Sequence, residues 1–122
     1  MKQIALVAMG GAAGSVLRFL AQKWISFGPL PKFPIGTLTV NLVGCLLIGL
    51  FFGLFTKNAS LHTDWKLFLM TGLCGGFTTF SAFTLESVAL LEASRYTTFL
   101  TYISLSVVAG ILATFAGYWL TR

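Results

Sequence analysis

Long hydrophobic runs separated by short charged stretches make up most of this chain. The uncharged runs cover residues 3–17, 33–56, 67–85 and 96–121. Each of the last three reaches the roughly 20 residues that a membrane-spanning helix needs. The first is shorter, but Arg18 and Lys23 can extend their charged ends to the membrane surface from within a longer helix. The pattern therefore predicts four transmembrane helices, at about residues 2–27, 33–56, 64–93 and 96–121.

The composition agrees with an all-α membrane protein. Of the 122 residues, 57% are hydrophobic and only 9% are charged, which is typical of membrane proteins. We expect one four-helix transmembrane domain over residues 1–122, with a chain reversal at the prolines of the first connection. A cleaved signal peptide is the rival interpretation of the first segment, but only further membrane segments follow it. Cys45 and Cys74 both lie within predicted spans, which favours packing thiols over a disulfide.

The charges in the connections hardly define an orientation. With four spans, the two termini and the second connection share one side of the membrane. That side carries four positive charges, and the other carries three or four, depending on whether Arg18 is counted. The positive-inside rule therefore hardly favours one orientation over the other. Two hypotheses stay open: an unseen partner fixes the orientation, or the protein inserts both ways and pairs with inverted copies of itself. Small residues at close-packing spacing, such as Gly10 with Gly14 and Gly49 with Gly53, predict tight helix contacts within and between subunits.

The third predicted span contains the most unusual segment, residues 72–83, with the sequence GLCGGFTTFSAF. A glycine pair weakens a membrane helix, and backbone groups freed at that depth need partners in protein or water. We therefore expect this helix to be broken at Gly75 and Gly76. Phe77, Phe80 and Phe83 recur every three residues, which is usual for a packing stripe. Here they alternate with hydroxyl side chains, and the positive edge of an aromatic ring can stabilise an anion.

Other polar groups fall inside the spans. Asn41 is costly to bury unless it is paired, and it can bond another helix or face a pore; its spacing favours the first. Arg18 can reach the headgroups or act as a fixed charge that concentrates anions. Tyr102 and Ser106 lie one turn apart on the fourth helix. Glu86 is the one acid that lies away from the ends of a predicted span, either as a proton site or as a partner for polar groups.

These groups are rich in neutral hydrogen-bond donors and poor in catalytic chemistry. The chain has one histidine, no plausible metal-binding set of side chains and no nucleophile beside a base. An enzyme is therefore not expected. Neutral donors can replace the hydration shell of a small anion without trapping it, so the sequence favours an anion pathway.

Three motifs, at residues 10–19, 36–44 and 72–83, strongly resemble those of the Fluc (CrcB) fluoride channels. The resemblance implies a multi-pass protein of the cell (inner) membrane that exports cytoplasmic fluoride passively. It also implies a dual-topology antiparallel homodimer with two fluoride pores. A structural sodium ion, Na+, would lie at the dimer centre, held by the backbone carbonyls of Gly75 and Thr78.

The resemblance also implies which side chains serve the ion. The anion pathway would include Asn41, Phe80, Ser81, Phe83, Thr84, Tyr102 and Ser106, with Arg18 as the charge of the vestibule. The chain departs from the family pattern at Ala82, where a threonine is usual. Gly110 likewise offers no side chain where a small polar residue would extend the polar track.

Two alternatives belong to other classes. A small multidrug-type proton-coupled exporter has the same length and helix number, but it needs a carboxylate in the first helix, and this helix has Arg18 instead. A non-conducting accessory membrane subunit would explain the glycines, but not Asn41 together with the polar and aromatic third span. The expected partners are a second copy of the chain, the lipid bilayer and fluoride, with no nucleic acid.

Overall fold

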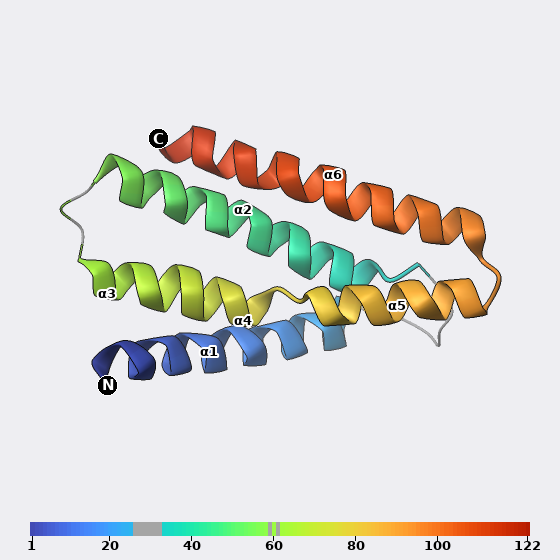
Figure 1. The fold of residues 1–122 in the computed structure, drawn as a ribbon, viewed down its shortest axis with the longest axis horizontal. Coiled ribbons are helices and arrows are strands. Elements are labelled where there is room, and N and C mark those ends of the chain that lie inside the picture. Colours follow the sequence, from blue (N-terminus) through green and yellow to red (C-terminus); the bar gives the residue numbers. More distant parts are fainter. Residues whose placement is uncertain (26–32, 59, 61) are drawn as a thin grey trace.

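The computed structural model describes residues 1–25, 33–58, 60 and 62–122, and within them all regular structure is helical (Figure 1). Four helical segments are long and apolar enough to cross a membrane, which confirms the four predicted spans. The elements are α1 (Lys2–Ile25), α2 (Ile35–Lys57), α3 (Thr63–Lys66), η1 (Leu67–Cys74), α4 (Gly75–Phe77), α5 (Phe80–Glu92) and α6 (Tyr96–Thr121). Most of the predicted proline-rich reversal, including Pro29 and Pro31, lies outside the described residues.

The third span is the irregular one. It is assembled from α3, the π-helical η1, α4 and α5, and helical conformation stops at Thr78 and Thr79. Both residues are extended, with ψ angles of 159° and 124°. The glycine pair, in contrast, belongs to α4, and Gly75 has ordinary right-handed helical angles. The interruption therefore lies three residues beyond the first of the two glycines at which we expected it.

The glycines let α1 approach the third span closely. A Cβ atom added at Gly10 would lie 2.9 Å from the Cα of Gly72, and one added at Gly14 would lie 2.8 Å from the amide nitrogen of Phe77. Gly76 makes the reciprocal contact, since its added Cβ would lie 3.0 Å from the Cα of Gly11. Backbones packed at such distances leave no room for a side chain. Of the glycine pair, Gly76 thus serves helix packing, whereas a Cβ atom added at Gly75 would meet only the Met70 carbonyl, at 3.9 Å.

α2 packs along α6 through a second set of small residues. A Cβ atom added at Gly117 would lie 2.7 Å from the amide nitrogen of Leu50, and one at Gly49 would lie 2.9 Å from the carbonyl carbon of Thr114. These contacts confirm that the predicted small-residue spacing brings helices together within one subunit. Gly110 differs, because its added Cβ would meet only the sulfur of Cys45, at an ordinary 3.5 Å.

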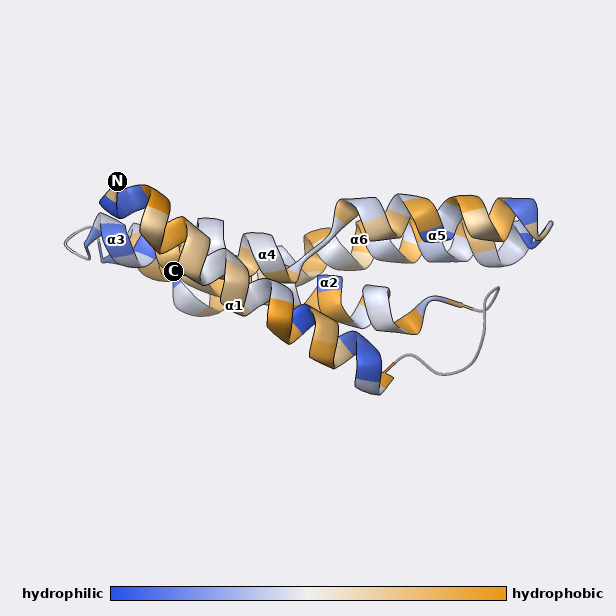
Figure 2. Ribbon diagram, turned by 90° about the horizontal axis from the view of Figure 1, so that it is seen from below, coloured by the Kyte–Doolittle hydropathy of each residue, from blue (hydrophilic) through white to orange (hydrophobic). Residues whose placement is uncertain are grey.

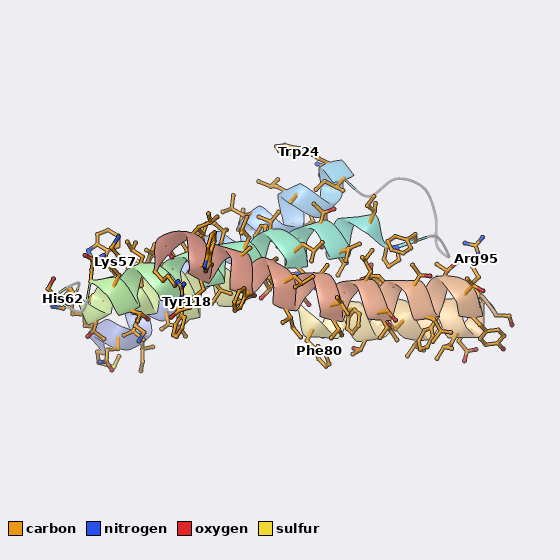
Figure 3. All side chains as sticks on the ribbon, turned by 90° about the horizontal axis from the view of Figure 1, so that it is seen from above. Trp24, Lys57, His62, Phe80, Arg95 and Tyr118 are labelled. Atoms are coloured by element: carbon orange, nitrogen blue, oxygen red, sulfur yellow. The ribbon has the colours of Figure 1, made fainter. Side chains whose placement is uncertain are left out.

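Most of the charged residues that the structure describes lie at the two ends of the bundle. Both termini and the α2–α3 connection lie at one end, and the turn between α5 and α6 lies at the other (Figure 1). Lys57 and His62 mark the first end and Arg95 the second (Figure 3). Lys2 and Asp64 form an ion pair of 2.7 Å at the first end. Hydrophobic residues cover much of the length between these ends (Figure 2), as expected for a protein whose outer surface faces lipid.

Candidate functional site

Side chains from α1 and α2 hold the interruption of the third span. The amide nitrogen Nδ2 of Asn41 donates to the carbonyl of Thr79 at 3.0 Å, and the backbone amide of Thr79 donates to Oδ1 of Asn41 at 2.8 Å. Nε of Arg18 donates to the carbonyl of Gly76 at 3.2 Å. Backbone groups released from a helix inside a membrane must find partners in protein or water. Asn41 and Arg18 are such partners.

The two carbonyls predicted to bind a cation have lost their usual helical donors. In a continuous α-helix the amide of Thr79 would donate to Gly75, and the amide of Ala82 would donate to Thr78. Here the Thr79 amide donates to Asn41, and the Ala82 amide donates to Oγ1 of Thr79 at 3.1 Å, capping α5. The interruption thus redirects both donors away from the carbonyls of Gly75 and Thr78.

An open groove with a volume of about 410 Å³ runs beside the interruption, between α2, η1 and α6. Six of the predicted site residues line it: Asn41, Gly75, Thr78, Phe80, Phe83 and Ser106. The groove therefore brings together residues from three spans that are far apart in the sequence. The side chain of Phe80 projects away from the bundle (Figure 3) and is 76% exposed. Among the described residues, the Ser106 hydroxyl is the one buried side-chain polar group without a hydrogen-bond partner.

Phe83 stands between the groove and the core. Its ring centroid lies 5.8 Å from that of Phe80 on one side and 5.1 Å from that of Tyr102 on the other. Tyr102 is completely buried and also packs edge-on against Phe33. Tyr102 is not part of the groove wall, so the structure places it behind Phe83 as a support. Its hydroxyl donates to Oε1 of Glu86 at 3.4 Å.

Two side-chain hydrogen bonds near Glu86 join the spans in pairs. Nε2 of Gln22 on α1 donates to Oγ1 of Thr37 on α2 at 2.9 Å. The hydroxyl group of Tyr102 on α6 donates to the Glu86 carboxyl group on α5. A pocket of about 400 Å³ lies beside these residues, and its lining includes Gln22, Thr37, Glu86 and Ala82. Glu86 therefore serves here as a partner for a polar group of α6.

Comparison with known proteins identifies the family of this chain. The family model described as "CrcB-like protein, Camphor Resistance (CrcB)" matches residues 5–118. The chain belongs to the CrcB family. Curated proteins named "Fluoride-specific ion channel FluC" are similar to it. The one from Phocaeicola vulgatus is 47% identical over 122 residues, which is all of both chains. The one from Flavobacterium psychrophilum is 48% identical, covering 96% of this chain and 94% of its own, and the one from Pseudomonas putida is 48% identical, covering 98% and 96%.

Besides Tyr102, three predicted site residues of this CrcB-family chain lie outside the groove. Ser81 and Thr84 are exposed on α5, and the Thr84 hydroxyl donates back to the Ser81 carbonyl at 2.9 Å. Arg18 lies on the opposite side of the third span, where it bonds Gly76. Ala82 also faces away from the groove, so a hydroxyl at this position would enter the pocket beside Glu86. The structure thus separates the Ala82 position from the two phenylalanines that line the groove.

The sequence motifs did not predict that Gln22 bonds Thr37 or that Thr79 caps α5. The signal for Gln22 was its place one turn after Arg18, on the same face of a predicted span. A polar amide there needs a partner inside the protein. Thr79 directly precedes a helical run, and its side-chain oxygen can accept from the backbone amide two or three residues later, as an N-cap residue does.

Proposed function

We propose that this protein is a fluoride-selective ion channel that lets fluoride leave the cytoplasm passively across the cell inner membrane. The observation that carries the proposal is the groove beside the interrupted third span, in a chain whose bacterial relatives bear the name of fluoride-specific channels. The four spans make it a multi-pass membrane protein. The named function is ion transport, which is not an enzymatic activity.

The chemistry of the groove suits a small anion. None of its described lining residues is charged, so an anion meets hydroxyl groups, amides and aromatic rings. The Ser106 hydroxyl has no protein partner and is free to donate to the ion. The edges of Phe80 and Phe83 carry positive potential. Nδ2 of Asn41 has a second hydrogen beyond the one given to Thr79. Together these donors replace water around fluoride without binding it too strongly to leave.

Arg18 would serve the channel from outside the groove. Its guanidinium group keeps its charge while one N–H bonds the Gly76 carbonyl. A fixed positive charge near the path raises the local concentration of anions. Arg18 would therefore have two roles, one in attracting fluoride and one in stabilising the end of α4.

We infer that two copies assemble as an antiparallel homodimer with two pores. The groove is open along one side, and Phe80 on its rim is 76% exposed. A second copy would cover it and bring its own phenylalanines to the path. The near balance of positive charge between the two ends is compatible with insertion in both orientations. An inverted partner would place the same groove against its counterpart across a two-fold axis.

We also propose that a structural sodium ion joins the two copies. The carbonyl oxygens of Gly75 and Thr78 would hold it, because the amides that normally bond them are redirected. Carbonyl oxygens suit hard cations of this kind. Within the described part of the chain, no group of three or more His, Cys, Asp and Glu side chains could hold a metal ion, so a cation near the groove would depend on backbone oxygens. Such an ion would stabilise the interface and take no part in transport.

The decisive experiment is fluoride efflux from liposomes that contain the purified protein, measured with a fluoride electrode in sodium buffer. Fast release of fluoride but not chloride supports the proposal, and no release above empty liposomes overturns it. Ser106→Ala should slow efflux, because it removes the unpartnered hydroxyl. Ser104→Ala is the matched control, since Ser104 is exposed on the same helix outside the groove.

A further inference from the structure

A second open groove, with a volume of about 550 Å³, continues from the first one along α2 and α6. Cys45, Ser106 and Val107 line both grooves, so the two meet at these residues. Beyond them the second groove passes Gly110 and ends near Tyr118. An ion that moves from one groove to the other along α6 has to pass the side chains of Cys45, Ser106 and Val107, which form the junction.

The junction has two polar groups from different helices. Cys45 on α2 is half-buried and its thiol is free. Ser106 on α6 has a buried hydroxyl without a hydrogen-bond partner. Gly110, one turn further along α6, has no side chain, and a Cβ atom added there would lie 3.5 Å from the Cys45 sulfur. The sulfur of Cys45 therefore borders the space that a side chain at position 110 would fill.

We propose that Cys45 is a specificity-determining residue of the ion pathway. The ion passes from the first groove to the second between Cys45 and Ser106, and the thiol sets the width of this passage. The Ser106 hydroxyl donates to the ion there, while the thiol is a small, weak donor that narrows the path without binding the ion tightly. Pore width and donor number together determine which anions pass. The inference rests on the proposed function.

Three substitutions at Cys45 test the width directly. Cys45→Ser keeps the size and should leave fluoride efflux within about twofold of the unchanged protein. Cys45→Leu should fill the junction and slow fluoride efflux by about tenfold or more. Cys45→Ala should keep fluoride efflux and raise chloride leak, because it widens the passage. A folded Cys45→Leu variant that conducts like the unchanged protein would overturn the inference, and so would an unchanged chloride leak in Cys45→Ala.

A labelling experiment covers the case in which Cys45→Leu does not fold. A Cys74→Ser background leaves one thiol; Cys74 is 2% exposed where it borders the first groove, and serine keeps its size. The Cys45 thiolate attacks the sulfenyl sulfur of a trimethylammonium-ethyl methanethiosulfonate reagent, forms a disulfide with it and releases methanesulfinate, and the thiol proton goes to the buffer. We expect a single adduct by mass spectrometry, a loss of fluoride efflux and its recovery with dithiothreitol.

The outcomes separate this inference from the proposed function. An adduct on Cys45 that leaves efflux unchanged overturns the inference alone, and so does a thiol that stays unreactive during prolonged exposure. A protein without fluoride efflux before labelling overturns the proposed function instead. Cys45→Ala in the same background is the control, because it removes the target and should make efflux insensitive to the reagent.

Discussion

Replacing Asn41 by alanine tests whether this side chain holds the interruption of the third span. The substitution removes two hydrogen bonds, of 2.8 and 3.0 Å, and leaves both the amide and the carbonyl of Thr79 without a partner. Each unsatisfied group inside a protein costs about 1–3 kcal/mol. Side-chain hydrogen bonds measured in membrane proteins average a smaller value, about 0.6 kcal/mol. Because both groups of one residue lose partners together, we expect a loss of about 2–4 kcal/mol in the free energy of unfolding.

The assay is equilibrium unfolding in mixed detergent micelles, followed by the fluorescence of the three tryptophans. Asn58→Ala is the matched control: Asn58 is exposed and its side-chain amide donates to the Leu54 carbonyl at 3.1 Å, so its loss should cost less than about 0.5 kcal/mol. The reasoning fails if Asn41→Ala costs no more than this control. It also fails if Asn41→Ala lowers fluoride efflux while stability stays unchanged, since Asn41 would then act on the ion alone.

Three further substitutions extend the test. Gly117→Ala should destabilise the protein by about 1–3 kcal/mol in the same unfolding assay, because its Cβ would press against the backbone carbonyl of Leu46. Arg18→Ala should lower both stability and fluoride efflux, since it leaves the Gly76 carbonyl unpaired and removes a positive charge; equal efflux would contradict the vestibule role. Ala82→Thr should change efflux by less than about threefold, because position 82 faces away from the groove; a larger change would show that it contacts the ion.

The sequence predicted the spans well because charge and hydropathy fix them locally. The fourth predicted helix, at residues 96–121, agrees with α6, and the second differs from α2 by only one or two residues at each end. A run of about 20 apolar residues with charges at both ends has the length and composition of a membrane-spanning helix. The close contacts of Gly49 and Gly53 also followed from spacing alone, since small residues one turn apart leave a flat surface for a neighbouring helix.

The position of the interruption could not be predicted from local sequence. Glycine weakens a helix, and that argument pointed to Gly75 and Gly76. Both stay helical, and Gly76 packs against α1. The helix is interrupted at Thr79, whose backbone bonds Asn41, a residue 38 positions away in the chain. Contacts over such a separation depend on how the spans pack, and helix propensity contains no information about them.

The two hydrogen bonds between Asn41 and Thr79 have a consequence for membrane insertion during synthesis. Asn41 is synthesised 38 residues before the backbone groups that it bonds. When α2 first enters the bilayer, the side-chain amide of Asn41 therefore has no partner. Exposing a polar amide to hydrocarbon costs several kcal/mol. Until the third span arrives, α2 is best accommodated beside water or the insertion machinery. Completion of the third span then supplies the missing partner, so release of the nascent bundle into lipid is linked to the arrival of Thr79.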